Sequence, residues 1–271
     1  MVKKRIDILL VEKGLAESRN RAQRLVMAGE VRVEGEMIHK SSTQVAEDAR
    51  VEVLQRPKFV SRGGKKLAAA IETFAPKISG KICADVGSST GGFTDCLLQN
   101  GAKKVYSIDV GYGLLHWKLR QDARVVVMER TNARYLKTLP EFVDLVTIDA
   151  SFISLLMLLP VVKQWFESQE GRVIALIKPQ FEAGRKAAAV HAGVILDEKV
   201  HQNVLSKTII ESEKLGFYVH GLIASPIQGP KGNVEFLVDL RLVLPSHALD
   251  IPILIEHALK MKPHKSTDSR H

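Results

Sequence analysis

The chain contains few of the features that mark secreted, metal-binding or membrane proteins. It has only two cysteines in 271 residues, Cys83 and Cys96, and no nearby cluster of histidines, which argues against a disulfide framework or a metal site. No apolar run approaches the roughly 18 residues of a membrane span. The longest candidate, 154–165, contains Pro160 and Lys163, and the first residues lack the apolar stretch of a secretory signal. We therefore expect a reduced, cytoplasmic protein with no metal and no membrane partner.

The charge of the chain is unevenly distributed. Hydrophobic residues make up 45% and charged residues 25%, which is ordinary for a globular protein, but the net charge is +9. Residues 1–66 contain 15 Lys and Arg against 9 Asp and Glu. A basic segment of this kind indicates a polyanionic partner such as RNA, with a merely solvated surface as the alternative.

Residues 82–98 hold the strongest local pattern in the chain. A short apolar run ends at Asp85, a turn rich in Gly and Ser follows, and an amphipathic helix begins near Gly92. This order predicts the first strand, loop and helix of a doubly wound α/β sheet, which binds nucleotide-like ligands beyond the carboxyl ends of its strands. The candidate ligand-binding residues in this stretch are Asp85, Gly87, Ser88, Ser89, Thr90, Gly91, Gly92 and Phe93.

The spacing of the glycines narrows the class of ligand that the loop can bind. It is G-x-x-x-G-G, which is neither the dinucleotide fingerprint nor a triphosphate loop. Asp109 ends the next strand a little over twenty residues after Gly87, where such folds hold ribose hydroxyls. Asn132, after the third strand, is a candidate contact to adenine. Together these residues predict an adenosine-containing ligand, and S-adenosylmethionine (SAM) suits a loop without phosphate-binding residues better than NAD does.

Residues 1–55 have the pattern of a small separate module. Two short amphipathic helices, the second capped by Ser18, precede a hairpin around Glu34-Gly35-Glu36. This order resembles the alpha-L RNA-binding module of a ribosomal small-subunit protein, pseudouridine synthases and tyrosyl-tRNA synthetases. The resemblance implies that RNA phosphates are contacted by Arg5, Arg19, Arg21, Arg24 and Arg32. A helical cap on the larger domain is the alternative.

After a linker at 56–62, residues 63–245 alternate between strand and helix patterns. We predict strands at 82–86, 104–109, 124–128, 144–148, 172–177, 217–224 and 234–242, and helices near 64–74, 92–100, 113–120, 154–166 and 197–215. The last two strands have no helix between them, which predicts an antiparallel pair at the sheet edge, typical of SAM-dependent methyltransferases. Residues 181–193 are a candidate lid, and 246–271 a peripheral tail.

Four charged residues lie where predicted strands or helices open toward the ligand edge: Lys66, Asp149, Lys178 and Glu235. They match the Lys-Asp-Lys-Glu tetrad of the FtsJ-like ribose 2′-O-methyltransferases. With the segments 60–67, 109–113 and 225–235, they make the chain resemble the TlyA family, which joins an alpha-L module to an FtsJ-like domain and whose members often carry the label hemolysin. Lys65 is an adjacent alternative; Lys66 is chosen because it directly precedes Leu67, as in the family's Lys-Leu pair.

The resemblance implies a ribosomal-RNA ribose 2′-O-methyltransferase. A 2′-hydroxyl must lose its proton as it attacks the sulfonium methyl of SAM, and we expect Lys178 to act as the base or to orient the hydroxyl. Asp149 would position Lys178, while Lys66 and Glu235 fix the ribose. The alternatives are a membrane-active hemolysin and an RNA-binding ribosome factor without activity. The target nucleotide, the subunit that carries it, and the oligomeric state do not follow from the sequence.

Overall fold

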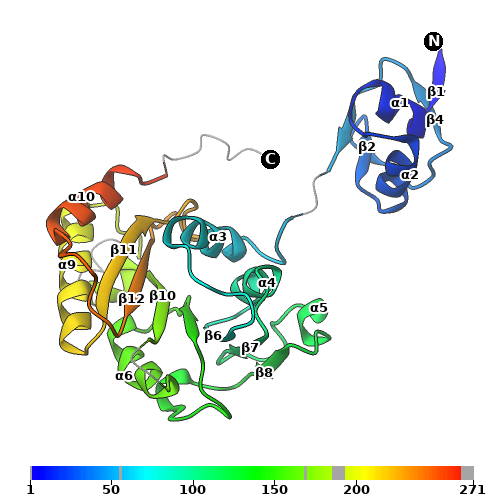
Figure 1. The fold of residues 1–271 in the computed structure, drawn as a ribbon. Coiled ribbons are helices and arrows are strands. Elements are labelled where there is room, and N and C mark those ends of the chain that lie inside the picture. The colour runs from blue at the N-terminus through cyan, green and yellow to red at the C-terminus, as the bar shows by residue number, and fades with distance from the viewer. Residues whose placement is uncertain (1, 55–56, 168–169, 185–192, 264–271) are drawn as a thin grey trace. The chain divides into compact units, whose positions relative to one another are not determined.

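The computed structural model describes residues 2–54, 57–167, 170–184 and 193–263. The chain divides into two compact units, residues 1–58 and 59–271, and each is considered by itself (Figure 1). The expected linker therefore does not stand apart as a whole: Phe59 is 5% exposed in a core of the second unit, and the backbone N–H of Val60 donates to Asp95 at 2.9 Å. In the described part of the chain, no helix has both the length and the apolar character needed to cross a bilayer.

The first unit packs two helices against two small sheets. Its elements are β1 (Lys3–Arg5), α1 (Ile6–Glu12), α2 (Arg19–Met27), β2 (Val31–Val33), β3 (Glu36–Met37), β4 (Gln44–Ala46) and β5 (Val51–Val53). Strand β1 pairs with β4, and β2 lies between β3 and β5, with every pair antiparallel. The Ser18 hydroxyl accepts from the Arg21 N–H at 3.3 Å, as expected for a helix cap. Glu34 and Gly35 both have positive φ, as a two-residue hairpin turn requires.

The second unit is built on a seven-stranded sheet. Its strands are β6 (Ile82–Val86), β7 (Lys104–Ile108), β8 (Val125–Met128), β9 (Leu145–Ile148), β10 (Arg172–Ile177), β11 (Tyr218–Ala224) and β12 (Phe236–Arg241). They are ordered β11-β12-β10-β9-β6-β7-β8, and only β12 runs antiparallel to its neighbours. The chain moves outward from β6 through β7 to β8 and then returns to β9 on the other side of β6. This reversal is the switch point at which doubly wound sheets bind ligands.

Helices cover both faces of this sheet (Figure 1). One core contains residues of α3 (Gly63–Phe74), α4 (Gly92–Gln99) and α5 (Trp117–Arg120). The other contains residues of η1 (Ala133–Tyr135), η2 (Leu155–Met157), α6 (Leu159–Val162), η3 (Lys163–Trp165), α9 (Glu198–Lys214) and α10 (Ile251–Lys260). A short helix, α7 (Pro179–Glu182), follows β10. The predicted doubly wound α/β class is confirmed, and both cysteines are buried and free.

Two predictions of secondary structure and one of domain organisation were wrong in detail. The helix expected over 154–166 is divided into η2, α6 and η3, and the break before α6 falls next to Pro160, which has no N–H to continue a helical ladder. The helix expected over 113–120 spans only 117–120, since Gly113 has φ +72° and His116 caps the first turn. The expected peripheral tail contains α10, which buries Ile255, Ala258 and Leu259 in the main core. Residues 264–271 lie outside the described residues.

Candidate active site

The Gly-rich loop is held against the neighbouring strand end by backbone packing. Gly87 has φ +79°, and a Cβ placed on it would lie 2.7 Å from the Asp149 carbonyl oxygen. Gly91 has φ +95°, and α4 begins at the next residue, as predicted. The Asp109 carboxylate accepts from the N–H groups of Ser89 and Gly111, at 2.7 Å each. The Asp109 carboxylate, at the end of β7, therefore holds the Gly-rich loop in place through the Ser89 N–H.

Asp85, which we expected to contact the ligand, lies in the core instead. It belongs to β6, and its side chain is fully buried, accepting from Thr94 Oγ1 at 2.6 Å and Thr147 Oγ1 at 3.0 Å. Burial raises the pKa of the Asp85 carboxyl to about 7. The residue ties the first turn of α4 to β6 and β9, so its effect on the loop is indirect.

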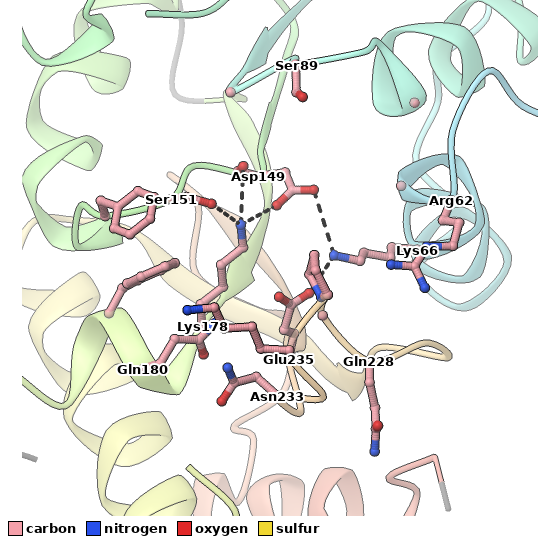
Figure 2. Close-up of a pocket in the computed structure, with 18 of the residues that line it drawn as sticks. Arg62, Lys66, Ser89, Asp149, Ser151, Lys178, Gln180, Gln228, Asn233 and Glu235 are labelled. Atoms are coloured by element: carbon pink, nitrogen blue, oxygen red, sulfur yellow. Dashed lines mark hydrogen bonds and ion pairs between the residues drawn. The ribbon is translucent and has the colours of Figure 1, made fainter. Parts of the chain in front are cut away.

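A pocket of about 1010 Å³ opens beside the loop (Figure 2). Its wall is formed by the loop, the start of α3, the segments that follow β9 and β10, and the segment that precedes β12. The lining residues predicted from sequence are Lys66, Gly87, Ser88, Ser89, Thr90, Gly92, Phe93, Asp149, Lys178 and Glu235. The elements thus bring all four members of the predicted tetrad to one cavity.

The four ionisable residues form an alternating chain of charge. Lys178 Nζ lies 2.6 Å from Asp149 Oδ1, and Lys66 Nζ lies 2.5 Å from Glu235 Oε2. The second oxygen of Asp149 is 3.9 Å from Lys66 Nζ, so this carboxylate stands between the two lysines. Lys178 also donates to Ser151 Oγ at 3.1 Å and to the Asp149 carbonyl at 3.4 Å, and the dashed lines in Figure 2 meet at its amine.

Because these four side chains are largely buried, each charge depends on its partner of opposite sign. The side chains of Lys66, Lys178 and Glu235 are each less than 10% exposed, and that of Asp149 is 20% exposed. Removing one partner would leave a charge in a poorly solvated site, which is strongly unfavourable. The two lysines balance the two carboxylates, so the group as a whole is neutral. The remaining cations on the pocket wall are Arg62 and Lys231, both exposed, within the described residues.

The structure does not bring every predicted ligand contact to the pocket wall. Gly91 faces Leu115 and Leu119. The Asp109 carboxylate accepts from Ser89 of the loop and from Gly111 after β7, and Asn132 is exposed and caps η1 by accepting from the Arg134 N–H. Together with Asp85, these residues support the fold around the pocket and do not line it.

Several lining residues were missed in the sequence. Ser151, Phe152 and Gln180 follow directly after the strand ends that carry Asp149 and Lys178. Their proximity in sequence to those two charges was the available signal. Part of the expected lid, residues 185–192, lies outside the described residues; Phe181 and Gly184 before it, and Gly193 after it, line the pocket.

The predicted RNA-contacting arginines fall into two groups. Arg5 and Arg19 both donate to Asp7, which is fully buried and also accepts from Gln23. The Arg5 guanidinium, with smaller contributions from Gln23 and Arg19, holds the pKa of the Asp7 carboxyl well below its usual range. The second group comprises Arg21, Arg24 and Arg32, which are exposed and do not bond to Asp7.

The reversed strand β12, the ligand loop at the switch point and the charged quartet together define a Rossmann-like methyltransferase. Residues 59–242 match the FtsJ-like methyltransferase family and residues 4–51 match the S4 domain. The chain therefore belongs to the FtsJ-like methyltransferase family, with an S4 domain at its N-terminal end.

Relatives of similar length share both parts. A Mycobacterium tuberculosis protein named 16S/23S rRNA (cytidine-2′-O)-methyltransferase TlyA is 43% identical over 241 residues, which cover 88% of this chain and 89% of the relative. Hemolysin A of Brachyspira hyodysenteriae is 40% identical over 236 residues, covering 86% and 98%. A solved structure of a Streptococcus thermophilus protein labelled as a hemolysin shares 40% identity, covers 96% of this chain and 97% of its own, and has a TM-score of 0.70. The predicted resemblance to the TlyA family is confirmed.

Proposed function

We propose that this protein transfers a methyl group from SAM to a ribose 2′-hydroxyl of ribosomal RNA. The observation that carries the proposal is the quartet of Lys66, Asp149, Lys178 and Glu235 in the same pocket as the Gly-rich loop. The M. tuberculosis relative named as an rRNA (cytidine-2′-O)-methyltransferase supports the choice of ribosomal RNA and of the ribose oxygen.

The chemistry of the loop fits SAM as the methyl donor. Its pocket-lining side chains are Ser88, Ser89 and Thr90, which offer neutral hydroxyls and no cation for a phosphate. Gly87 lets the backbone pass close to the end of β9, where a side chain would collide. When bound, SAM supplies an electrophilic methyl on a sulfonium. We assign its binding to residues 87–90 together with Gly92 and Phe93.

The quartet then acts on the ribose. Lys178 orients the 2′-hydroxyl, and its amine accepts the hydroxyl proton as the oxygen attacks, after it has first released its own extra proton to solvent. Asp149, at 2.6 Å from the Lys178 amine, fixes the direction of that amine. Lys66 and Glu235 hold the neighbouring ribose hydroxyl by donating and accepting hydrogen bonds. Most of the rate enhancement in this scheme comes from alignment of the oxygen with the methyl group.

In this proposal the first unit binds the RNA. Arg21, Arg24 and Arg32 are exposed cations on an S4 domain, and such side chains bind phosphates without reading sequence. At the pocket, the ring of Phe152 is 91% exposed and offers a surface on which an unstacked nucleobase can lie. The substrate in this proposal is a nucleotide displaced from its stack within structured ribosomal RNA.

Two other functions deserve a test in the same experiment. A catalytically silent ribosome factor would bind SAM and RNA without transfer. The hemolysin label of the Brachyspira relative suggests membrane lysis, but four ionisable side chains gathered in one pocket have a role in methyl transfer and none in lysis.

The test is transfer of labelled methyl from SAM to purified small and large ribosomal subunits and to free ribosomal RNA. We expect label in RNA, at a position that resists alkaline cleavage because its 2′-oxygen is methylated. Binding of SAM without label in any RNA would favour the silent factor. Lysis of erythrocytes by protein that transfers no methyl would favour the hemolysin.

A further inference from the structure

The short helix α7 and the residue before it hold one loop at both of its ends. The helix begins directly after Lys178 and ends at Glu182. The loop in question follows β9 and runs from Asp149 to Leu155. Lys178 binds its first part through Asp149 and Ser151. Glu182 binds its last part, so the two ends of one helical turn fix the two ends of the loop.

The contacts of Glu182 are short and specific. One carboxylate oxygen accepts from Ser154 Oγ at 2.5 Å, and the other accepts from the Leu155 N–H at 2.6 Å. Burial raises the pKa of this carboxyl, although both hydrogen bonds favour its ionised form. Ser154 also caps η2 by accepting from the Leu156 N–H at 3.3 Å. Glu182 is therefore bonded to the first turn of η2, and it does not use either oxygen for the quartet.

The loop between these two attachments is strained. Phe152 has φ +64°, a conformation that non-glycine residues seldom adopt, and its side chain is 91% exposed. Such a conformation costs on the order of 1–3 kcal/mol and persists only where the surroundings impose it. The Phe152 ring lies 5.0 Å from that of Phe181, centroid to centroid. Phe181 is also in α7, so the loop is contacted by Phe181 and Glu182 of this helix and by Lys178 directly before it.

We propose that Glu182 is a positioning residue for methyl transfer: it holds the Asp149–Leu155 loop in the strained form that places Asp149 against Lys178 and Phe152 at the pocket. This inference rests on the proposed methyltransferase function. Without Glu182, the loop can relax its positive φ, and the catalytic carboxylate at its start moves relative to the amine. The SAM-binding loop at 87–92 meets this segment at Gly87, beside the Asp149 backbone, and we expect it to keep its shape because Asp109 holds it through the Ser89 N–H.

A glutamine in place of Glu182 can keep both of its contacts with the loop. In Glu182→Gln the amide oxygen accepts from the Leu155 N–H, and the amide nitrogen donates to the Ser154 hydroxyl, which can accept as well as donate. Both attachments survive without the charge. In Glu182→Ala both are lost. The exposed Glu213 of α9 gives a matched control, since Glu213→Ala removes a carboxylate of the same chain far in sequence from the loop.

The experiment measures kcat and KM for RNA, SAM affinity and the thermal midpoint for the wild type, E182Q, E182A and E213A, at a temperature where all are folded. We expect E182A to lose about tenfold or more in kcat, with SAM affinity unchanged, because small misplacements of reacting groups are costly. E182Q and E213A should retain kcat within about threefold, a difference below 1 kcal/mol.

Folded E182A with the kcat of the wild type overturns the proposal, as does E182Q that is as impaired as E182A. If E182A does not fold, Ser154→Ala removes one attachment, and folded S154A with unchanged kcat overturns it equally. A wild type that transfers no methyl refutes the proposed function instead, so the two failures are distinguishable.

Discussion

Lys65 and Lys66 are neighbours in sequence and occupy opposite environments. Lys65 is exposed, whereas Lys66 is 7% exposed and lies 2.5 Å from Glu235. The helix α3 turns one side chain to solvent and the next into the pocket. The geometry thus assigns the quartet position to Lys66, the choice made from the Lys-Leu pair.

The first prediction compares these two lysines. Lys66→Ala leaves the buried Glu235 carboxylate without its partner and should cost about 3–5 kcal/mol of folding free energy. Lys65→Ala should change stability by less than about 0.5 kcal/mol. Urea unfolding of both variants measures the difference. The double variant K66A/E235Q should regain part of the stability but no methyl transfer, and equal effects of K65A and K66A would contradict the assignment.

The second prediction concerns Lys178. Lys178→Ala removes the amine to which we assign the orientation of the 2′-hydroxyl, and it should lower methyl transfer by about 100-fold or more, the usual contribution of a positioned acid or base. SAM affinity, measured by calorimetry, should stay close to that of the wild type, because residues 87–92 do not contact Lys178 in any hydrogen bond or ion pair described above. Strong residual transfer in this variant would remove Lys178 from its assigned role.

A third prediction follows from Asp85, whose folded-state pKa of about 7 lies above its value of about 3.9 in an unfolded chain. Since the folded pKa is raised, the contribution to stability is fully present below about pH 4 and is lost as pH rises to about 7. The loss is on the order of 4 kcal/mol at most. Asp85→Asn cannot ionise, so its stability relative to the wild type should increase between pH 4 and 7 and then level off.

Fluorescence-detected urea unfolding at several pH values measures this effect. Both tryptophans, Trp117 and Trp165, belong to the second unit, so the signal reports the unit that contains Asp85. A difference between wild type and D85N that is the same at pH 5 and pH 8 would show that the carboxyl is not ionising in this range.

The fourth prediction concerns the exposed arginines of α2. Arg21→Ala and Arg24→Ala should each weaken binding to ribosomal RNA regardless of its sequence, and should reduce the slope of log K against log salt by about 1. Filter binding at several salt concentrations checks this. Lys77→Ala, which removes an exposed cation of the second unit, is the charge-matched control. Arg19→Ala should in addition lower stability, because it removes a partner of the buried Asp7.

Two members of the quartet could be predicted from the strand ends, whereas Lys66, in α3, and Glu235, just before β12, were assigned from the match to the family's tetrad. Asp149 and Lys178 come directly after β9 and β10, and adjacent parallel strands deliver such residues to the same edge. The same reasoning failed for Asp85. A carboxylate within a strand faces one side of the sheet or the other, and the motif does not reveal that Thr94 and Thr147 meet it inside the core.

The sequence does contain a signal for the C-terminal helix α10, which was not predicted. Asp250 caps it by accepting from the Ile253 N–H at 3.1 Å, and Pro252 stands in its first turn. Ile251, Ile255 and Leu259 recur at helical spacing on its inner face. The contacts of Glu182 had no comparable signal, because they depend on how a strained loop folds back onto a four-residue helix.

In the described part of the chain, the apolar core of the first unit is a cluster distinct from the two cores that flank the large sheet. Mutations that reshape one cluster therefore leave the packing of the other intact. Substitutions within residues 2–54 can change the charged surface of the first unit while the packing around the quartet stays constant. The two units can in this way evolve at different rates, since among the described residues no side chain belongs both to the core of the first unit and to a core of the second.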